Sequence, residues 1–165
     1  MTERRPLDDF DLKILSELQR DGRIRNNELA ERVGLSEPPC RRRVRTLRER
    51  GYVSAIRATI DETLLGYEVI SFVLIQLQSQ AQGPLQAFEK SIVAAPLVLQ
   101  SWRISGDADY LLKCVARNVE GMHQQLLQFS AIPEVRHIRT FPVLGTAKDA
   151  PLPIPNTAAA SDPAQ

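Results

Sequence analysis

Cysteine, histidine and tryptophan are scarce in this chain of 165 residues, which has two, two and one of them. A transition-metal site needs several Cys or His side chains at ligand spacing, and Cys40, Cys114, His123 and His137 are far apart. Both cysteines occupy apolar registers, so we expect small buried residues in a reducing compartment rather than a disulfide. The sequence therefore predicts no metal site.

Long hydrophobic runs are also missing. No apolar stretch approaches the roughly 18 residues that a transmembrane helix needs, and the first residues are polar and charged, unlike a signal peptide. We therefore expect a cytoplasmic protein with no membrane partner. Asp107 and Asp109 are a pair of carboxylates, but no nucleophile–base pair or phosphate-binding glycine loop accompanies them. We expect a protein that is not an enzyme and uses no cofactor.

The nearly neutral composition conceals an uneven distribution of charge. Residues 1–60 have fourteen Lys and Arg against ten Asp and Glu, whereas residues 61–165 have seven against ten. This asymmetry indicates a basic half that binds nucleic acid and an acidic half with another task. A chance fluctuation of solvated charges is the alternative, and it is weakened because six arginines lie between Arg41 and Arg50.

A helix-turn-helix pattern surrounds these arginines. Apolar residues at helical spacing predict a first helix over residues 8–21 and a second over 27–33, which ends at Gly34. Ser36 offers a side-chain oxygen that would cap a third helix, and two prolines in the first turn of that helix cost little. The sequence thus predicts three short helices before residue 51.

The third helix has an apolar face and a basic face. Cys40, Val44 and Leu47 form an apolar stripe, and Arg42 and Arg45 lie opposite to it. Such a helix is typical of recognition helices in the DNA major groove, so we expect these two arginines to read bases. The other candidate DNA contacts are Ser36, Pro38, Arg41, Thr46 and Arg48. The two arginines in this second group flank the stripe and are assigned to phosphates, while a solvated surface charge is the alternative for any one of them.

Residues 51–60 alternate apolar and polar side chains, which predicts a short strand or wing. Three helices and this strand predict a winged helix-turn-helix domain over residues 1–52, followed by a linker strand or hinge over residues 53–66. A unit of about 50 residues has a small core. We therefore expect it to be supported by the rest of the chain or by a partner subunit.

The second half predicts an α+β domain with the ferredoxin-like order β-α-β-β-α-β over residues 67–147. Its predicted strands are 69–77, 97–104, 110–116 and 135–144. Both helices would cover one sheet face, and the first strand is apolar on both sides. A bare apolar sheet face is typical of an interface, which predicts a homodimer formed sheet to sheet; the alternative is that the tail or wing covers it.

The tail over residues 148–165 is rich in proline and alanine. We expect residues 151–154 to stay near the C-terminal domain and the last ten residues to be disordered.

The turn between the second and third predicted strands combines a glycine with two aspartates, which is compatible with a plain turn or with a small-molecule site. It consists of Ser105, Gly106, Asp107, Ala108, Asp109 and Tyr110. Carboxylates pair with the ammonium group of an amino acid, and exposed backbone N–H groups accept its carboxylate. A plain hairpin turn is the alternative, because glycine and aspartate favour turns in any case.

Together these segments resemble the Lrp/AsnC family of feast-or-famine transcriptional regulators over roughly residues 6–155. The resemblance lies in LDDFDLKILSELQRDGRIRNNELAERVGLS, in the run from Pro39 through Cys40, Val44 and Leu47 to Gly51, in SGDADYLLK, and in the late strand followed by PLPI. It implies a helix-turn-helix domain joined to a ferredoxin-like effector-binding domain, often called RAM. It further implies dimers, often assembled into octamers, that bind amino acids at subunit interfaces.

The resemblance thus implies a sequence-specific regulator that binds double-stranded DNA and responds to an amino acid at residues 105–110. Two residues depart from the family pattern. Pro38 stands where many members have threonine or another polar residue, and it has no N–H to donate to a base. Ala108 stands where many members have a larger residue, which changes the expected pocket. A ligand-independent architectural protein that wraps DNA stays open as the alternative.

Overall fold

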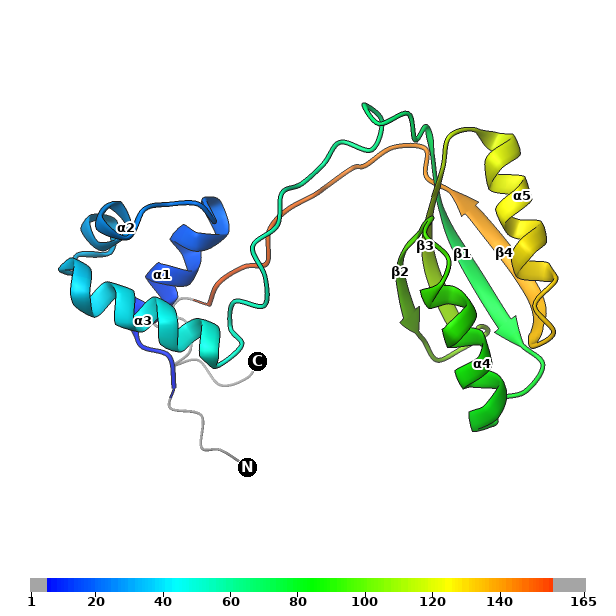
Figure 1. The fold of residues 1–165 in the computed structure, drawn as a ribbon, viewed down its shortest axis with the longest axis horizontal. Coiled ribbons are helices and arrows are strands. Elements are labelled where there is room, and N and C mark those ends of the chain that lie inside the picture. Colours follow the sequence, from blue (N-terminus) through cyan, green and yellow to red (C-terminus); the bar gives the residue numbers. More distant parts are fainter. Residues whose placement is uncertain (1–5, 156–165) are drawn as a thin grey trace, which may run out of the picture. The chain divides into compact units, whose positions relative to one another are not determined.

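The computed structural model describes residues 6–155 (Figure 1). The chain divides into two compact units: the described residues up to Thr59 together with those from Asp149 onward, and Ile60–Lys148 between them. The disorder expected for residues 156–165 lies outside the described residues. No helix in residues 6–155 is long and apolar enough to cross a membrane.

Three helices form the N-terminal unit: α1 (Asp9–Arg20), α2 (Asn26–Val33) and α3 (Glu37–Glu49). α1 begins with a capping box, in which the Asp8 carboxylate accepts from the Asp11 N–H over 3.0 Å and the Asp11 carboxylate accepts in return. α2 ends at Gly34, whose φ of +75° favours glycine. The helices enclose a core of Ile14, Leu29, Ala30, Val33, Cys40, Val44 and Leu47. The predicted helices and the apolar stripe of the third are therefore confirmed.

The predicted cap of α3 is wrong in one respect. Ser36 occupies the N-cap position, but its side chain makes no capping hydrogen bond. An N-cap oxygen accepts from the N–H of the second or third helical residue. Those residues are Pro38 and Pro39, which have no N–H to donate.

The strand predicted over residues 51–60 is also wrong, because no strand forms there. A strand needs a neighbouring backbone with which to share its hydrogen bonds. The described sheet contains only strands of the second unit, so this segment has no partner within residues 6–155. Ile56 and Ile60 consequently remain about half exposed, at 46% and 57%.

Residues 149–155 belong to the N-terminal unit. The prediction that residues 151–154 stay near the C-terminal domain is therefore wrong. The side chain of Gln19 on α1 donates a hydrogen bond to the Leu152 carbonyl oxygen over 3.0 Å. Leu15 and Leu18 of α1, residues 52–57 and residues 152–155 line an apolar hollow of about 600 Å³. Residues 152–155 pack against this side of α1 because the contact removes apolar surface on both segments from water.

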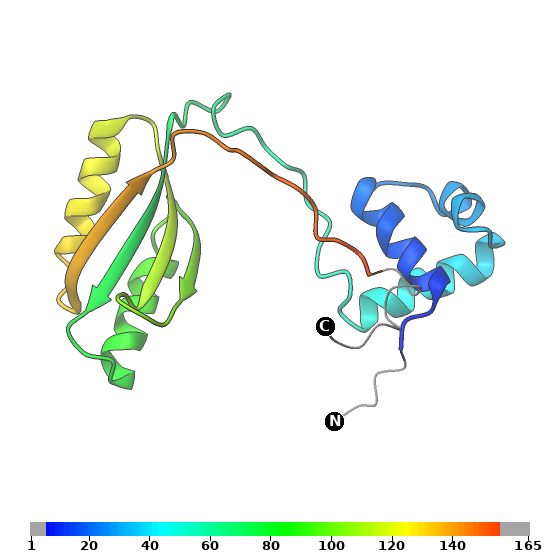
Figure 2. The ribbon, with the colours of Figure 1, turned by 180° about the vertical axis from the view of Figure 1, so that it is seen from behind.

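The second unit is a four-stranded antiparallel sheet with two helices. The strands β1 (Val69–Leu77), β2 (Val98–Arg103), β3 (Tyr110–Ala116) and β4 (Val135–Pro142) follow the order β2-β3-β1-β4. The helices α4 (Gln82–Val93) and α5 (Val119–Ser130) cover the same face of the sheet (Figures 1 and 2). This is the predicted ferredoxin-like arrangement.

The helix-covered face contains the core of this unit. Val73 and Ile75 of β1 and Leu112 of β3 are fully buried beneath Phe88 of α4 and the side chains of α5. Cys114 also lies in this core, where burial raises the pKa of its thiol to about 12. Cys40 and Cys114 are both buried and unbonded, as predicted.

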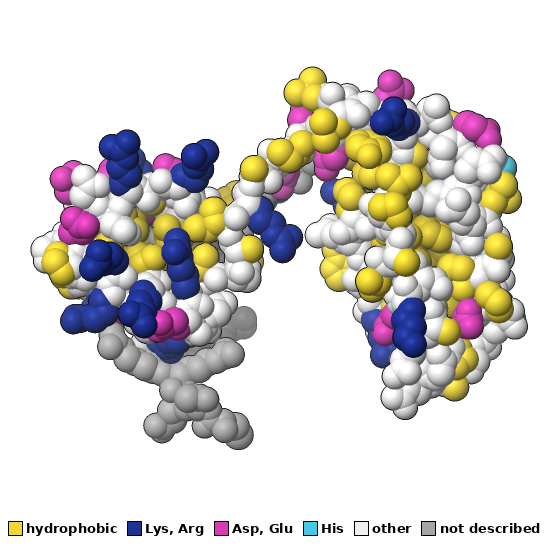
Figure 3. Space-filling view, viewed as in Figure 1, with side chains coloured by type: hydrophobic (Ala, Val, Ile, Leu, Met, Phe, Trp, Pro, Cys, Tyr) yellow, Lys and Arg dark blue, Asp and Glu magenta, His cyan; other side chains and the backbone are white. Residues whose placement is uncertain are grey.

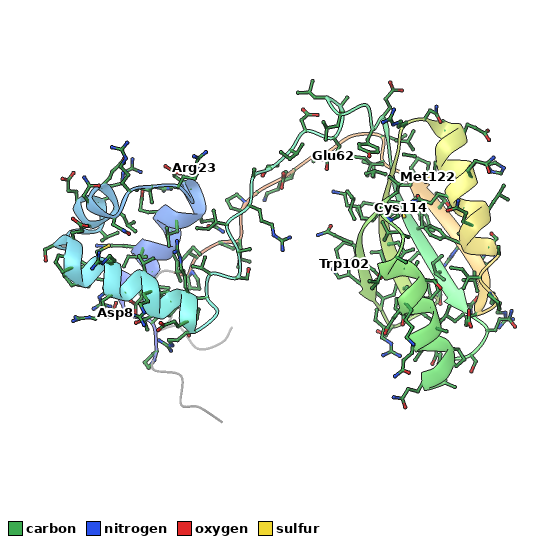
Figure 4. All side chains as sticks on the ribbon, in the orientation of Figure 1. Asp8, Arg23, Glu62, Trp102, Cys114 and Met122 are labelled. Atoms are coloured by element: carbon green, nitrogen blue, oxygen red, sulfur yellow. The ribbon has the colours of Figure 1, made fainter. Side chains whose placement is uncertain are left out.

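No helix of the second unit, Ile60–Lys148, covers the opposite face of the sheet. Phe72 pairs with Phe141 across β1 and β4, and Trp102 pairs with Leu111 across β2 and β3. Trp102, labelled in Figure 4, is 41% exposed and Phe141 is 49% exposed. The predicted bare apolar face is therefore present.

Candidate DNA-binding surface and effector pocket

The sequence-predicted DNA contacts all lie on α3 or at its N-cap. Cys40, Val44 and Leu47 are buried on its inner face. The exposed candidates are Ser36, Pro38, Arg41, Arg42, Arg45, Thr46 and Arg48. Figure 3 shows Lys and Arg side chains gathered on the N-terminal unit. An exposed basic helix face above a buried stripe is the geometry with which a recognition helix enters the major groove.

Two hydrogen bonds form between residues on the outer face of α3. The Arg45 Nε donates to Glu49 Oε1 over 2.7 Å, and this hydrogen bond raises the pKa of the Arg45 guanidinium above its ordinary value. The Arg45 side chain nevertheless remains 80% exposed. Thr46 donates its hydroxyl hydrogen to the Arg42 carbonyl oxygen over 3.0 Å. The side chains of Arg42 and Arg45 are both exposed on this helix.

Arg43 has a different task, which the sequence reasoning missed. Its Nη1 donates to Asp8 Oδ2 over 2.7 Å and to Asp11 Oδ1 over 2.8 Å. Figure 4 labels Asp8, which lies beside α3. These hydrogen bonds, first that to Asp8, raise the pKa of the Arg43 guanidinium. Arg43 therefore connects α3 to the start of α1. The signal that could have identified this role is the pair of acids three residues apart, which face an arginine of another helix.

The candidate effector loop borders a hollow of about 210 Å³ in the second unit. The lining consists of Gln76, Leu77, Gln78, Ser79, Gln80, Gly106, Asp107, Ala108, Asp109 and Arg136. Four of the six predicted effector residues are among them. Ser105 is exposed outside the lining, and Tyr110 is buried in the core on the helix side of the sheet. Gly106 has a φ of +124°, a conformation that a side chain would strain.

The two aspartates of this loop have separate roles. Asp109 is buried, and its carboxylate accepts from the Leu77 N–H over 2.7 Å and from the Gln80 side chain over 2.8 Å. It therefore fastens the turn after β1 to the turn before β3. Asp107 is exposed and lines the hollow.

Tyr110 anchors the loop from the other side of the sheet. Its hydroxyl donates to Glu89 Oε1 over 2.7 Å, and its ring lies 4.8 Å from that of Phe88, centroid to centroid. Burial, followed by the hydrogen bond to Glu89, raises the pKa of Tyr110 to about 12. Its position makes it a support of the loop rather than part of the lining.

Sequence reasoning missed Gln80 and Arg136 as parts of this hollow. Gln76 pairs with His137, next to Arg136, so the end of β1 and the start of β4 meet beside the loop. The antiparallel pairing of the first and last strands in a ferredoxin-like fold was the signal that would have found Arg136. The lining of the hollow consequently includes a carboxylate residue, Asp107, and a guanidinium residue, Arg136.

The fold and these two surfaces define a class of protein: a helix-turn-helix DNA-binding unit with a separate small-molecule-binding unit. Comparison with known domains agrees with this class. Residues 7–54 match the family model for winged helix-turn-helix DNA-binding domains, and residues 70–153 match that for the Lrp/AsnC ligand binding domain. The chain therefore belongs to the Lrp/AsnC family and is a DNA-binding transcriptional regulator of that type.

Named relatives are regulators as well. The chain is 43% identical over 151 residues to a leucine-responsive regulatory protein from Rhizobium meliloti, covering 91% of this chain and 97% of the relative. It is 39% identical to the Bkd operon transcriptional regulator of Pseudomonas aeruginosa, over 81% of this chain and 88% of that one. A solved regulator from Neisseria meningitidis in complex with L-Met has a TM-score of 0.85 and 30% identity, over 90% of this chain and 97% of the other.

Proposed function

We propose that this regulator binds double-stranded DNA through α3 and changes its DNA occupancy when an amino acid enters the hollow beside residues 106–109. The observation that carries this proposal is the pair of opposite charges, Asp107 and Arg136, on one small hollow. An amino acid is a zwitterion, whose ammonium suits a carboxylate and whose carboxylate suits a guanidinium. A relative's structure with L-Met supports the ligand class. The protein acts in the cytoplasm as a regulator and not as an enzyme.

Ala108 enlarges the space that an effector's side chain can occupy in this hollow. It is buried at the lining, and its methyl group leaves room that a larger residue would fill. The backbone groups of the Gly106 turn complete the polar rim. We therefore propose that selectivity for the effector's side chain comes from the space beside Ala108, and its affinity for the zwitterion from the two charges.

A thermal-melt screen of the protein against the twenty amino acids tests this proposal. A ligand that binds only the folded state stabilises it by about 2.7 kcal/mol at a hundredfold excess over its Kd. We expect at least one amino acid to raise the Tm, and Asp107→Ala to abolish that increase while its own Tm and its DNA affinity without ligand stay unchanged. Asp109→Ala is the contrasting variant, because it removes the buried hydrogen bonds to Leu77 and Gln80 and should lower the Tm itself.

The architectural alternative predicts another result. If no amino acid changes the Tm, and the protein binds its own upstream region no more tightly than random DNA at the same salt concentration, DNA wrapping without a ligand describes it better.

We further propose that the functional unit is a homodimer joined through the bare sheet face, with octamers built from such dimers. Phe72, Leu111, Trp102 and Phe141 offer this face as apolar surface, and a closed two-fold pairing buries the same patch twice. A dimer implies a pseudo-palindromic DNA site with half-sites about one helical turn, or a multiple of it, apart.

Trp102→Glu should weaken this dimer about tenfold or more, because a charge on each copy must be buried in an apolar interface. Sedimentation equilibrium measures the change. Val93→Glu is the matched control, since Val93 is 88% exposed at the end of α4, away from the bare face. An unchanged dimerisation constant in Trp102→Glu together with a weakened one in Val93→Glu would place the interface on the helices instead.

A further inference from the structure

A second hollow lies in the C-terminal unit, between α5 and the sheet. It has a volume of about 390 Å³, which is within the range of small-molecule sites. Its lining consists of Glu68, Val69, Ile70, Ser71, Val119, Met122, His123, Leu126, Thr140, Pro142 and Val143. None of these residues borders the hollow beside the effector loop. The wall is mostly apolar, and Met122, labelled in Figure 4, supplies an adaptable thioether side chain from α5.

Ser71 is the unusual residue of this hollow. It is fully buried on β1, in the same register as the core residues Val73 and Ile75, and its hydroxyl has no hydrogen-bond partner in the described structure. Its cross-strand neighbours explain this isolation. They are Pro142, which has no N–H, and Cys114, whose thiol is a weak hydrogen-bonding group.

A buried hydroxyl without a partner destabilises the fold, and an alanine at the same position would avoid that cost. The hydroxyl therefore calls for a partner from outside the chain. The ionisable residues of the lining, Glu68 and His123, are exposed, so the buried part of the hollow consists of apolar side chains, the partly buried Thr140 and the Ser71 hydroxyl. A neutral oxygen fits such a floor, whereas a carboxylate would lose its hydration without a compensating charge.

We propose that this hollow binds a small, uncharged aliphatic carbonyl compound, whose chain lies against Met122 and Leu126 and whose oxygen accepts a hydrogen bond from the Ser71 hydroxyl. The site is separate from the effector pocket and does not depend on the proposed amino-acid response.

Methionine labelling gives a direct test, because the chain has only Met1 and Met122. In full-length protein with ¹³C-labelled methionine methyl groups, 4-methyl-2-pentanone should shift the Met122 signal saturably and leave the Met1 signal in place. Ser71→Ala should weaken binding about threefold to tenfold, the usual worth of one neutral hydrogen bond. The Tm of this variant without ketone should be unchanged or higher, because the hydroxyl that it removes has no partner.

Two matched variants complete the experiment. Ser91→Ala removes a hydroxyl that is bonded to the Ala87 carbonyl oxygen on α4, away from this hollow, and should leave ketone affinity unchanged. Val119→Trp places a large ring on a residue that is 76% exposed at the lining, and should block binding without lowering the Tm. Equal ketone affinity in the unsubstituted protein and Ser71→Ala overturns the proposal. So does a Met122 shift that follows protein concentration without ketone, since a second copy would then fill the hollow.

Discussion

Replacing Arg42 and Arg45 together by alanine is expected to reduce affinity for the specific DNA site by about a hundredfold or more. Each lost arginine–base contact costs about 1–3 kcal/mol and relaxes sequence preference at the base that it reads. Both side chains are exposed on the outer face of α3, opposite its buried stripe, so neither substitution removes a core contact. The fold of the double variant should therefore be intact. The effect of Arg45 alone should be the smaller one, because Glu49 already engages its Nε.

Electrophoretic mobility shifts or fluorescence anisotropy at stated salt would measure this loss on both the specific site and random DNA. Arg41→Ala and Arg48→Ala, at the flanks of the helix, should weaken both DNAs alike and reduce the salt dependence by about one unit each. Arg117→Ala, exposed in the second unit, is the charge-matched control. A double variant with the footprint and affinity of the unsubstituted protein would show that α3 does not read bases through these arginines.

Arg43→Ala should have the opposite profile and destabilise the N-terminal unit by about 1–2 kcal/mol. Removing one partner of a buried ion pair costs about 3–5 kcal/mol and an exposed pair contributes about 0–1 kcal/mol, and this partly buried pair lies between the two. The Asp11 carboxylate, on a side chain that is 8% exposed, would lose the Arg43 guanidinium as its partner, while the Asp8 carboxylate stays close to it. Arg42→Ala, one residue away, should change the stability by no more than about 0.5 kcal/mol.

Urea unfolding can separate the two units in one experiment. Trp102, the single tryptophan, lies on β2 of the second unit, so its fluorescence reports on that unit. Helical circular dichroism, to which α1, α2 and α3 contribute, should show an earlier transition in Arg43→Ala, while the Trp102 transition stays in place. Adding Asp11→Asn should recover part of the loss, because it removes the stranded charge. An unchanged dichroism midpoint in Arg43→Ala would mean that this ion pair contributes little to the fold.

Local patterns were sufficient to predict most of the architecture. The stripe of Cys40, Val44 and Leu47 has a helical period, and its burial in α3 follows from that period. Failures arose where structure depends on distant partners or on a neighbour's chemistry. The alternation of apolar and polar residues over 51–60 does not produce a strand, because no neighbouring strand is there to share its hydrogen bonds. Ser36 makes no capping hydrogen bond, because the two prolines that follow have no N–H to donate to its side chain.

The candidate site shows the same division between local and distant information. The loop at residues 105–110 was identifiable because glycine and aspartate concentrate there. The role of each residue in the loop was not identifiable, because it depends on the pairing of β3 with β1. That pairing places the Asp109 carboxylate at the Leu77 N–H and the Tyr110 side chain in the core. Arg136 comes from the last strand, and only the sheet order brings it to the loop. Charge pattern alone likewise did not separate Arg43, which ties two helices together, from Arg42, which is exposed.

The return of residues 149–155 to α1 makes the DNA-binding unit discontinuous along the chain, with Ile60–Lys148 inserted into it. Closing a flexible loop of that length would cost about 4 kcal/mol of chain entropy. The folded second unit avoids this cost, because its first and last strands, β1 and β4, are antiparallel neighbours. The Val143 N–H donates to the Ile70 carbonyl oxygen over 2.9 Å, so the points where the chain enters and leaves this unit lie side by side. During synthesis, the apolar side of α1 can thus be covered only once residues 149–155 have left the ribosome, by which time the whole of Ile60–Lys148 has been made.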